Sequence, residues 1–119
     1  MNAVDRNIEE TREEKIRTIA RYYGYDAQSR RCIEKMAELT QAINKYWRTD
    51  LQYGKKLNKP CSKYLPSDSD EYDDLIDAIA DVQIVLEQIK FFLAVQHDID
   101  QIIDDRLNWE MKVIGDEIG

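Results

Sequence analysis

Two pairs of carboxylates have the spacing that places them on one side of a helix. Glu34 and Glu38 are four residues apart, as are Asp77 and Asp81, and Asp74 lies about one turn before Asp77. A helix turns once every 3.6 residues, so each pair is stacked on a single helical face. If the two helices are antiparallel neighbours, the carboxylates converge, and hard oxygen ligands select Mg²⁺ or Mn²⁺. The spacing indicates a candidate metal site formed by Glu34, Glu38, Asp77 and Asp81.

A solvated acidic face is the alternative interpretation of both pairs. Glu34 and Glu38 lie almost opposite the apolar stripe of their own helix, which favours solvation for that pair. Asp77 and Asp81 lead into an apolar surface that has to be covered. Carboxylates beside a buried surface are unusual unless they are paired or bound to a metal. Spacing alone leaves both interpretations open.

Four helices are expected to position these carboxylates, because apolar residues recur at helical spacing along most of the chain. The expected ranges, in chain order, are 5–23, 26–50, 68–96 and 98–114, with a loop at 51–67 that contains both prolines. Gly24 suits the end of the first helix, and Asp26 and Asp98 suit the starts of the second and fourth. We therefore expect one all-α domain over residues 1–119, a bundle of about four helices.

Composition narrows the class of protein further. The chain has 119 residues, a formal net charge of −7, four glycines and two prolines, which disfavours a β-sandwich or barrel. The negative charge disfavours nucleic-acid binding, although bound divalent cations can reverse the local sign for a small phosphate ligand. No apolar stretch is long enough to span a membrane, and charges from Asp5 onward argue against a signal peptide. A cytoplasmic protein with no membrane partner is expected.

The second half of the third expected helix is apolar almost all round. Beyond its ordinary core stripe it carries Ile84, Val85, Phe91, Phe92 and Val95. A helix of this kind needs cover on every side, which a four-helix monomer rarely supplies. A homo-oligomer, a dimer or tetramer with this helix in its interface, is therefore expected.

Two stretches of the chain resemble the signature helices of the MazG-like nucleotide pyrophosphohydrolases. They are CIEKMAELTQAINKYW at residues 32–47 and LIDAIADVQIVLEQI at residues 75–89, which together with their gap cover about half of the chain. In that family one helix carries Glu-Glu-x-x-Glu and the next carries Glu-x-x-Asp followed by Val. The resemblance implies an all-α fold, assembly as dimers or higher oligomers, and Mg²⁺-dependent hydrolysis of nucleoside triphosphates to monophosphate and pyrophosphate.

The match departs from the family pattern at two of the four expected metal ligands. Three acidic residues fall on the family's acidic positions, namely Glu34, Glu38 and Asp81. Lys35 stands where the second Glu of the first motif is expected, and Ala78 stands where the Glu of the second motif is expected. Asp77, next to Ala78, is a candidate replacement for the missing carboxylate. The site is therefore either rebuilt on the pairs spaced four residues apart, or weakened or lost.

The first functional hypothesis is a Mg²⁺- or Mn²⁺-dependent pyrophosphohydrolase that cleaves a (d)NTP to the (d)NMP and pyrophosphate. Metal ions held by the four carboxylates of the candidate site would bridge the phosphates and activate the water that attacks the α-phosphorus. Lys45 and Arg48 are candidates for contacts to the triphosphate tail, and Trp47 is a candidate for stacking on the base. An aromatic residue at helical spacing equally suits a core.

The alternative hypothesis follows from Lys35 and Ala78. A chain that has lost two metal ligands is expected to be a catalytically impaired helical oligomer that binds a nucleotide or a protein partner. A helical interaction module unrelated to the pyrophosphohydrolases is the third possibility.

Overall fold

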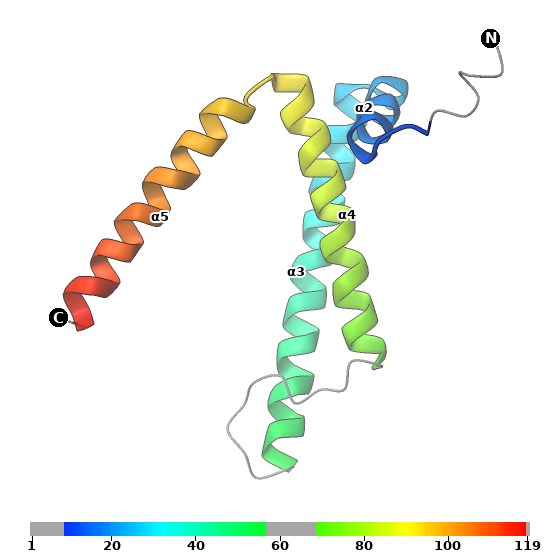
Figure 1. The fold of residues 1–119 in the computed structure, drawn as a ribbon. Helices are drawn as coiled ribbons and strands as arrows, with labels where there is room; N and C mark the ends of the chain where they lie inside the picture. Colours follow the sequence, from blue (N-terminus) through cyan, green and yellow to red (C-terminus); the bar gives the residue numbers. More distant parts are fainter. Residues whose placement is uncertain (1–8, 57–68, 119) are drawn as a thin grey trace.

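Four α-helices and no strand make up the regular structure of the part of the chain that we describe. The computed structural model describes residues 9–56 and 69–118, with the side chains of 53–56 left aside. The helices are α2 (Arg12–Tyr23), α3 (Tyr25–Lys56), α4 (Asp70–Leu93) and α5 (Gln96–Ile118), as Figure 1 shows. The prediction of an all-α fold with about four helices is confirmed.

The helix boundaries differ from the predicted ones, most clearly at the end of α3. α3 continues to Lys56, so the prediction of a loop is wrong for residues 51–56, and the rest of that loop lies outside the described residues. One internal glycine, Gly54, costs a helix only about 1 kcal/mol, which does not end a helix of 32 residues. α5 likewise continues past Gly115 to Ile118.

Local chemistry fixes the ends of the shorter helices. Thr11 and Glu14 form a reciprocal capping box, so α2 begins at Arg12, and the part of the predicted helix at 5–8 lies outside the described residues. Gly24, at φ 89°, ends α2 with a backbone conformation that side chains disfavour. The Ser69 hydroxyl accepts a hydrogen bond from the Tyr72 N–H at 3.1 Å and starts α4. Ala94 ends α4 in the left-handed region at φ 53°.

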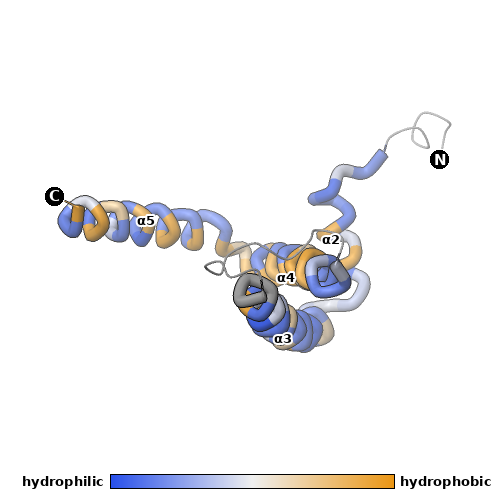
Figure 2. The backbone as a smooth tube through the Cα atoms, turned by 90° about the horizontal axis from the view of Figure 1, so that it is seen from below, coloured by the Kyte–Doolittle hydropathy of each residue, from blue (hydrophilic) through white to orange (hydrophobic). Residues whose placement is uncertain are grey.

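α3 and α4 run antiparallel and side by side, and this pair carries most of the tertiary packing (Figure 1). α2 lies across one end of the pair and contacts both helices. α5 leaves the end of α4 at an angle and packs closely on none of the other described helices. Figure 2 shows it standing apart from them, with hydrophobic residues along its length.

The core of the described residues is small. Its buried hydrophobic residues are Ala20, Cys32, Ala78, Val82 and Val85. At its centre Gln28 donates a 2.6 Å hydrogen bond to Gln88, which in turn donates one of 3.2 Å to the Ile16 carbonyl. Both glutamines are almost fully buried. These two hydrogen bonds therefore join α3, α4 and α2 at one point.

α2 covers part of the apolar surface for which an oligomer was predicted. Phe91 lies under the guanidinium groups of Arg17 and Arg21, whose Cζ atoms are 5.7 and 5.1 Å from the ring centre. Phe92 packs edge-on against Tyr25, and Val85 is buried within the chain. The argument that these side chains need cover from a second copy is therefore wrong for Val85 and incomplete for both phenylalanines. The sequence does not show where α2 packs.

No helix in the described part of the chain combines the length and the apolar character needed to cross a membrane.

Replacing Gln88 by Leu is expected to lower the free energy of unfolding by about 1–3 kcal/mol, because the buried Gln28 amide and the Ile16 carbonyl lose their partner. Urea unfolding followed by circular dichroism measures the change. The double variant Gln28→Leu/Gln88→Leu should recover part of the loss, since both partners of one buried hydrogen bond are then removed. Strictly additive losses would show that the two glutamines are not coupled.

Candidate acidic groove

A groove runs along one side of the contact between α3 and α4, and we call it the acidic groove. α3 contributes Glu38, Gln41, Ala42 and Lys45 to its lining. α4 contributes Glu71, Asp74, Asp77, Ala78 and Asp81. Five carboxylates thus face one lysine along the groove, and the antiparallel packing brings together residues some 40 positions apart in the chain.

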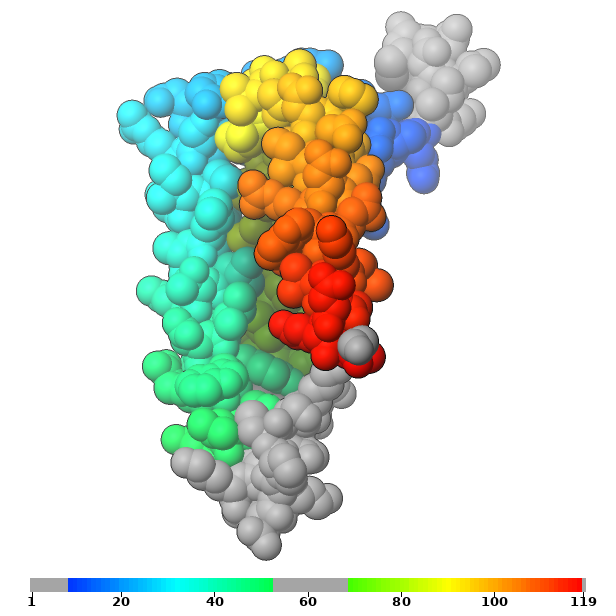
Figure 3. Space-filling view, turned by 90° about the vertical axis from the view of Figure 1, so that its left-hand side faces the viewer, coloured from blue at the N-terminus to red at the C-terminus, as the bar shows by residue number. Residues whose placement is uncertain are grey.

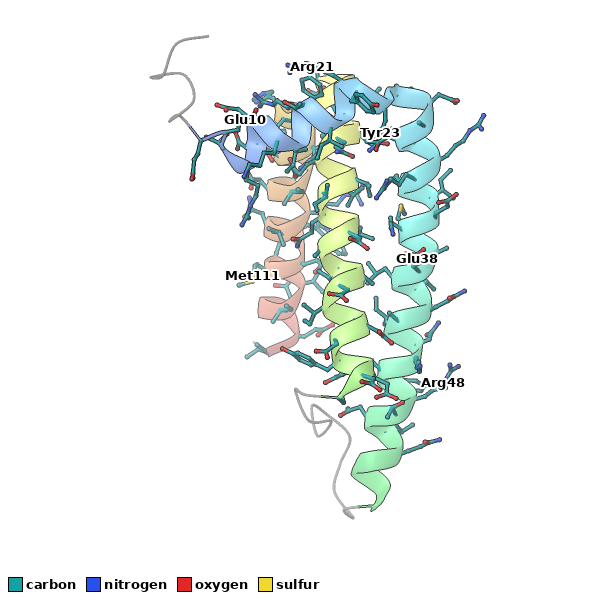
Figure 4. The ribbon with its side chains drawn as sticks, turned by 90° about the vertical axis from the view of Figure 1, so that its right-hand side faces the viewer. Glu10, Arg21, Tyr23, Glu38, Arg48 and Met111 are labelled. Carbon is teal, nitrogen blue, oxygen red and sulfur yellow. The ribbon has the colours of Figure 1, made fainter. Side chains whose placement is uncertain are left out.

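The groove contains four of the seven residues predicted for the site. Glu38, Asp77, Asp81 and Lys45 line it, in agreement with the expected convergence of two helices. Figure 4 views the pair with Glu38 on α3 beside α4. Asp74 and Glu71 extend the acidic lining by a further turn of α4. Helical spacing predicts Asp74, three residues before Asp77, and Glu71, which the sequence analysis does not include, lies a further three residues before Asp74.

The other three predicted residues are not part of the groove lining. Glu34 is exposed on α3, one turn before Glu38. Arg48 is exposed and points away from α4 in Figure 4. Trp47 is 57% exposed, and at 100° per residue it lies about 160° round the helix from Lys45. Lys45 and Trp47 therefore do not face the same ligand from one copy of the chain.

Lys35 lies between the carboxylates of the two helices. Its Nζ atom is 3.2 Å from Glu38 Oε2 and 3.4 Å from Asp81 Oδ2. Its side chain is 23% exposed, and the two carboxylates are half-exposed. The hydrogen bond to Glu38, followed by that to Asp81, raises the pKa of Lys35 above its ordinary value of 10.5. The ammonium group is therefore the cation that neutralises this pair of carboxylates.

The residues of the groove, as they lie, do not fit a divalent cation. Within residues 9–56 and 69–118 no three acidic, histidine or cysteine side chains are grouped so that they could hold a metal ion. Two side chains contribute to this arrangement. Lys35 places a positive charge between two carboxylates, and Ala78 adds only a methyl group to the lining of the groove.

The sequence shows that Lys35 stands where the motif has a glutamate. It does not show that Lys35 contacts Glu38 and Asp81. The spacing of three residues between Lys35 and Glu38 is a visible signal, because such pairs are neighbours on a helix. The contact with Asp81 depends on how α3 and α4 are aligned, which the two helix patterns do not specify.

Replacing Lys35 by Met is expected to lower the melting temperature at neutral pH, because Glu38 and Asp81 then lose their shared cation. The folded-state pKa of this lysine is raised, so its contribution is complete below pH 10.5 and is lost as the pH rises through the folded-state value. Thermal melts of both proteins between pH 7 and 11.5 should therefore converge only at the alkaline end.

Lys45→Met is the matched control, because Lys45 lies on the same helix and in the same groove but forms none of these ion pairs. It should lower the melting temperature less than Lys35→Met does. Equal effects of the two substitutions would show that only the net charge of the groove matters.

Comparison of the chain with protein-family models, with curated proteins and with solved structures gives no match. The resemblance to the MazG-like pyrophosphohydrolases, carried by residues 32–47 and 75–89, therefore stays a prediction from the two motifs.

Proposed function

We propose that the acidic groove is a pyrophosphohydrolase-type centre in which Lys35 stands in place of a divalent cation, so that the protein is a binding module and not a hydrolase. The observation that carries this proposal is the contact of one ammonium group with Glu38 of α3 and Asp81 of α4. An internal cation neutralises these carboxylates permanently, whereas a metal ion would have to displace it before binding. The cytoplasmic location and the homo-oligomer are parts of the same proposal.

The charge of the groove favours a cationic ligand over a free nucleotide. Five carboxylates line the groove beside Lys45, and Lys35 offsets part of their charge. A triphosphate brings several negative charges and needs divalent cations to approach such a surface. A basic segment of a protein partner needs none, because its lysines and arginines complement the groove directly. Among the two ligands of the binding-module hypothesis, a protein partner is therefore the better fit.

Hydrolysis of nucleoside triphosphates is the second candidate function. It is favoured by the presence of Glu38, Asp77 and Asp81 in one groove with Lys45 at its side. These residues come from the two helices that carry the motifs, and they line one groove between those helices. This hypothesis requires Lys35 to leave its two carboxylates, which a direct assay tests.

The wild-type protein is expected to release no pyrophosphate from a panel of unmodified and modified nucleoside triphosphates with Mg²⁺ or Mn²⁺. Its melting temperature should also be indifferent to these ions at millimolar concentration. The double variant Lys35→Glu/Ala78→Glu introduces a carboxylate at both positions; Ala78 lines the groove but is also buried in the α3–α4 contact, so circular dichroism first checks that the variant keeps its helices. Metal should then stabilise the variant by mass action, by about 2.7 kcal/mol at a hundredfold excess over the dissociation constant.

The control variant is Asp81→Asn in both backgrounds, because it keeps the shape of the side chain and removes its charge. It should abolish the metal response of the double variant. Metal-dependent pyrophosphate release by the wild-type protein that Asp81→Asn abolishes would establish the second candidate and remove the first.

A further inference from the structure

α5 has an amphipathic pattern and no partner helix in the described chain. Its exposed apolar residues on one side, which we call the α5 stripe, are Ile103, Leu107, Met111 and Ile114. Each is between 46% and 68% exposed, and at 100° per residue the four lie within about 80° of one another. The far side carries Gln101, Asp105 and Lys112, each about 120–160° round the helix from Leu107. A helix of this kind is stable in water only when its apolar side is covered.

A second uncovered apolar surface lies on the α3–α4 pair, on the side away from the acidic groove. We call it the apolar face; it consists of Ile33, Met36, Ile43, Trp47, Ile79, Leu86 and Leu93. Its position follows from the helical period, because Ile79 is two residues after Asp77 and lies about 160° round α4 from it. On α3, Ile43 and Trp47 are each two residues from Lys45 and lie about 160° round the helix from it. These side chains are all at least 37% exposed.

The apolar face looks toward the space between the helix pair and α5. α2 contacts Gln88 and Phe91, which lie on the groove side of α4, so α2 and the groove share one side of the pair. α5 leaves on the other side (Figure 1). Figure 3 shows α3 and α5 as two ridges with α4 set back between them. The molecule is therefore V-shaped in this region, with uncovered apolar residues on both arms.

The size and length of these surfaces match those of a stable interface between two copies. Eleven large, roughly half-exposed side chains amount to on the order of 1,000 Å² of apolar surface per copy, and a standard interface buries about 800 Å² on each partner. The α5 stripe is about 17 Å long from Ile103 to Ile114, and the α3 part of the apolar face is about 21 Å long from Ile33 to Trp47.

The charges beside the two surfaces are complementary. Asp104 lies at one edge of the α5 stripe, with Asp100 one turn before it, and Arg48 lies at the outer edge of the apolar face on α3. Arg30 lies at the same edge of α3 and pairs with Asp26 of its own helix at 3.4 Å. These side chains are exposed, so they would form a polar rim round a covered apolar centre.

We propose that two copies of this chain interlock, so that the α5 stripe of each copy packs on the apolar face of the other. The arrangement that supports this exchange is the angle between α5 and the α3–α4 pair. Both arms carry an uncovered apolar surface, and the exposed charges beside the two surfaces are opposite in sign. The reciprocal exchange covers both surfaces of both copies at once and gives a closed two-fold assembly. It leaves the acidic groove open, and it rests on the homo-oligomer proposed above, whose interface it specifies, but not on what the groove binds.

Complementation between two variants tests the exchange. Leu107→Asp damages the α5 stripe and Ile43→Asp damages the apolar face, so light scattering should show a dimer for the wild type and a monomer for each variant. In an equimolar mixture one of the two exchanged contacts pairs an intact stripe with an intact face. The mixture should therefore form a dimer that dissociates at least tenfold more readily than the wild type.

Gln101→Asp is the matched control, since it adds the same charge about 120° round α5 from Leu107 and should leave the dimer unchanged. Circular dichroism of each variant checks that the helices persist, and Trp47→Asp on the same face replaces Ile43→Asp if that variant unfolds. A monomeric wild type would overturn the proposal and indicate that α5 folds back on its own chain. A mixture that stays monomeric would also overturn it, because like surfaces would then pair.

Discussion

The antiparallel contact between α3 and α4 is the constraint on which the other features depend. Its centre is built from small side chains, with Ala78, Val82 and Val85 buried along α4 and Cys32 buried on α3. Gln28 and Gln88 are buried in the same contact and are joined by a hydrogen bond. One side of the contact carries carboxylates, and the other carries isoleucine, leucine, methionine and tryptophan. The contact thus separates a charged side of the helix pair from an apolar side.

Lys35 shows how one ammonium group can offset part of the charge of a carboxylate cluster. Carboxylates that face each other across two helices repel, and a cation between them removes that repulsion. A metal ion and an ammonium group both supply the charge. Only the metal has vacant coordination positions for a phosphate oxygen or a water, whereas the ammonium group offers hydrogen bonds.

The sequence predicted those features that depend on helical period, and it did not predict those that depend on how helices meet. The antiparallel pair and the convergence of Glu38, Asp77 and Asp81 follow from stripes on α3 and α4. The position of α2 does not, so the cover that Arg17 and Arg21 give to Phe91 could not be foreseen. An aromatic ring suits stacking on a base, which makes Trp47 a candidate for a nucleotide contact, but Trp47 and Lys45 lie on different sides of α3. Gly54 predicts a loop from its residue type, whereas α3 continues through it to Lys56.

The conformation of Ala94 limits how α5 can move relative to α4. Its φ of 53° lies in a region that costs a residue with a side chain roughly 1–2 kcal/mol, and glycine is the usual occupant at such a helix end. α5 has 23 residues and is about 34 Å long, so it acts as a lever with its pivot at this residue. A rotation of 10° at the pivot moves the far end of the helix by about 6 Å. The methyl group of Ala94 narrows the range of backbone torsion angles that this residue can adopt. It therefore restricts how far the C-terminal end of α5 can move.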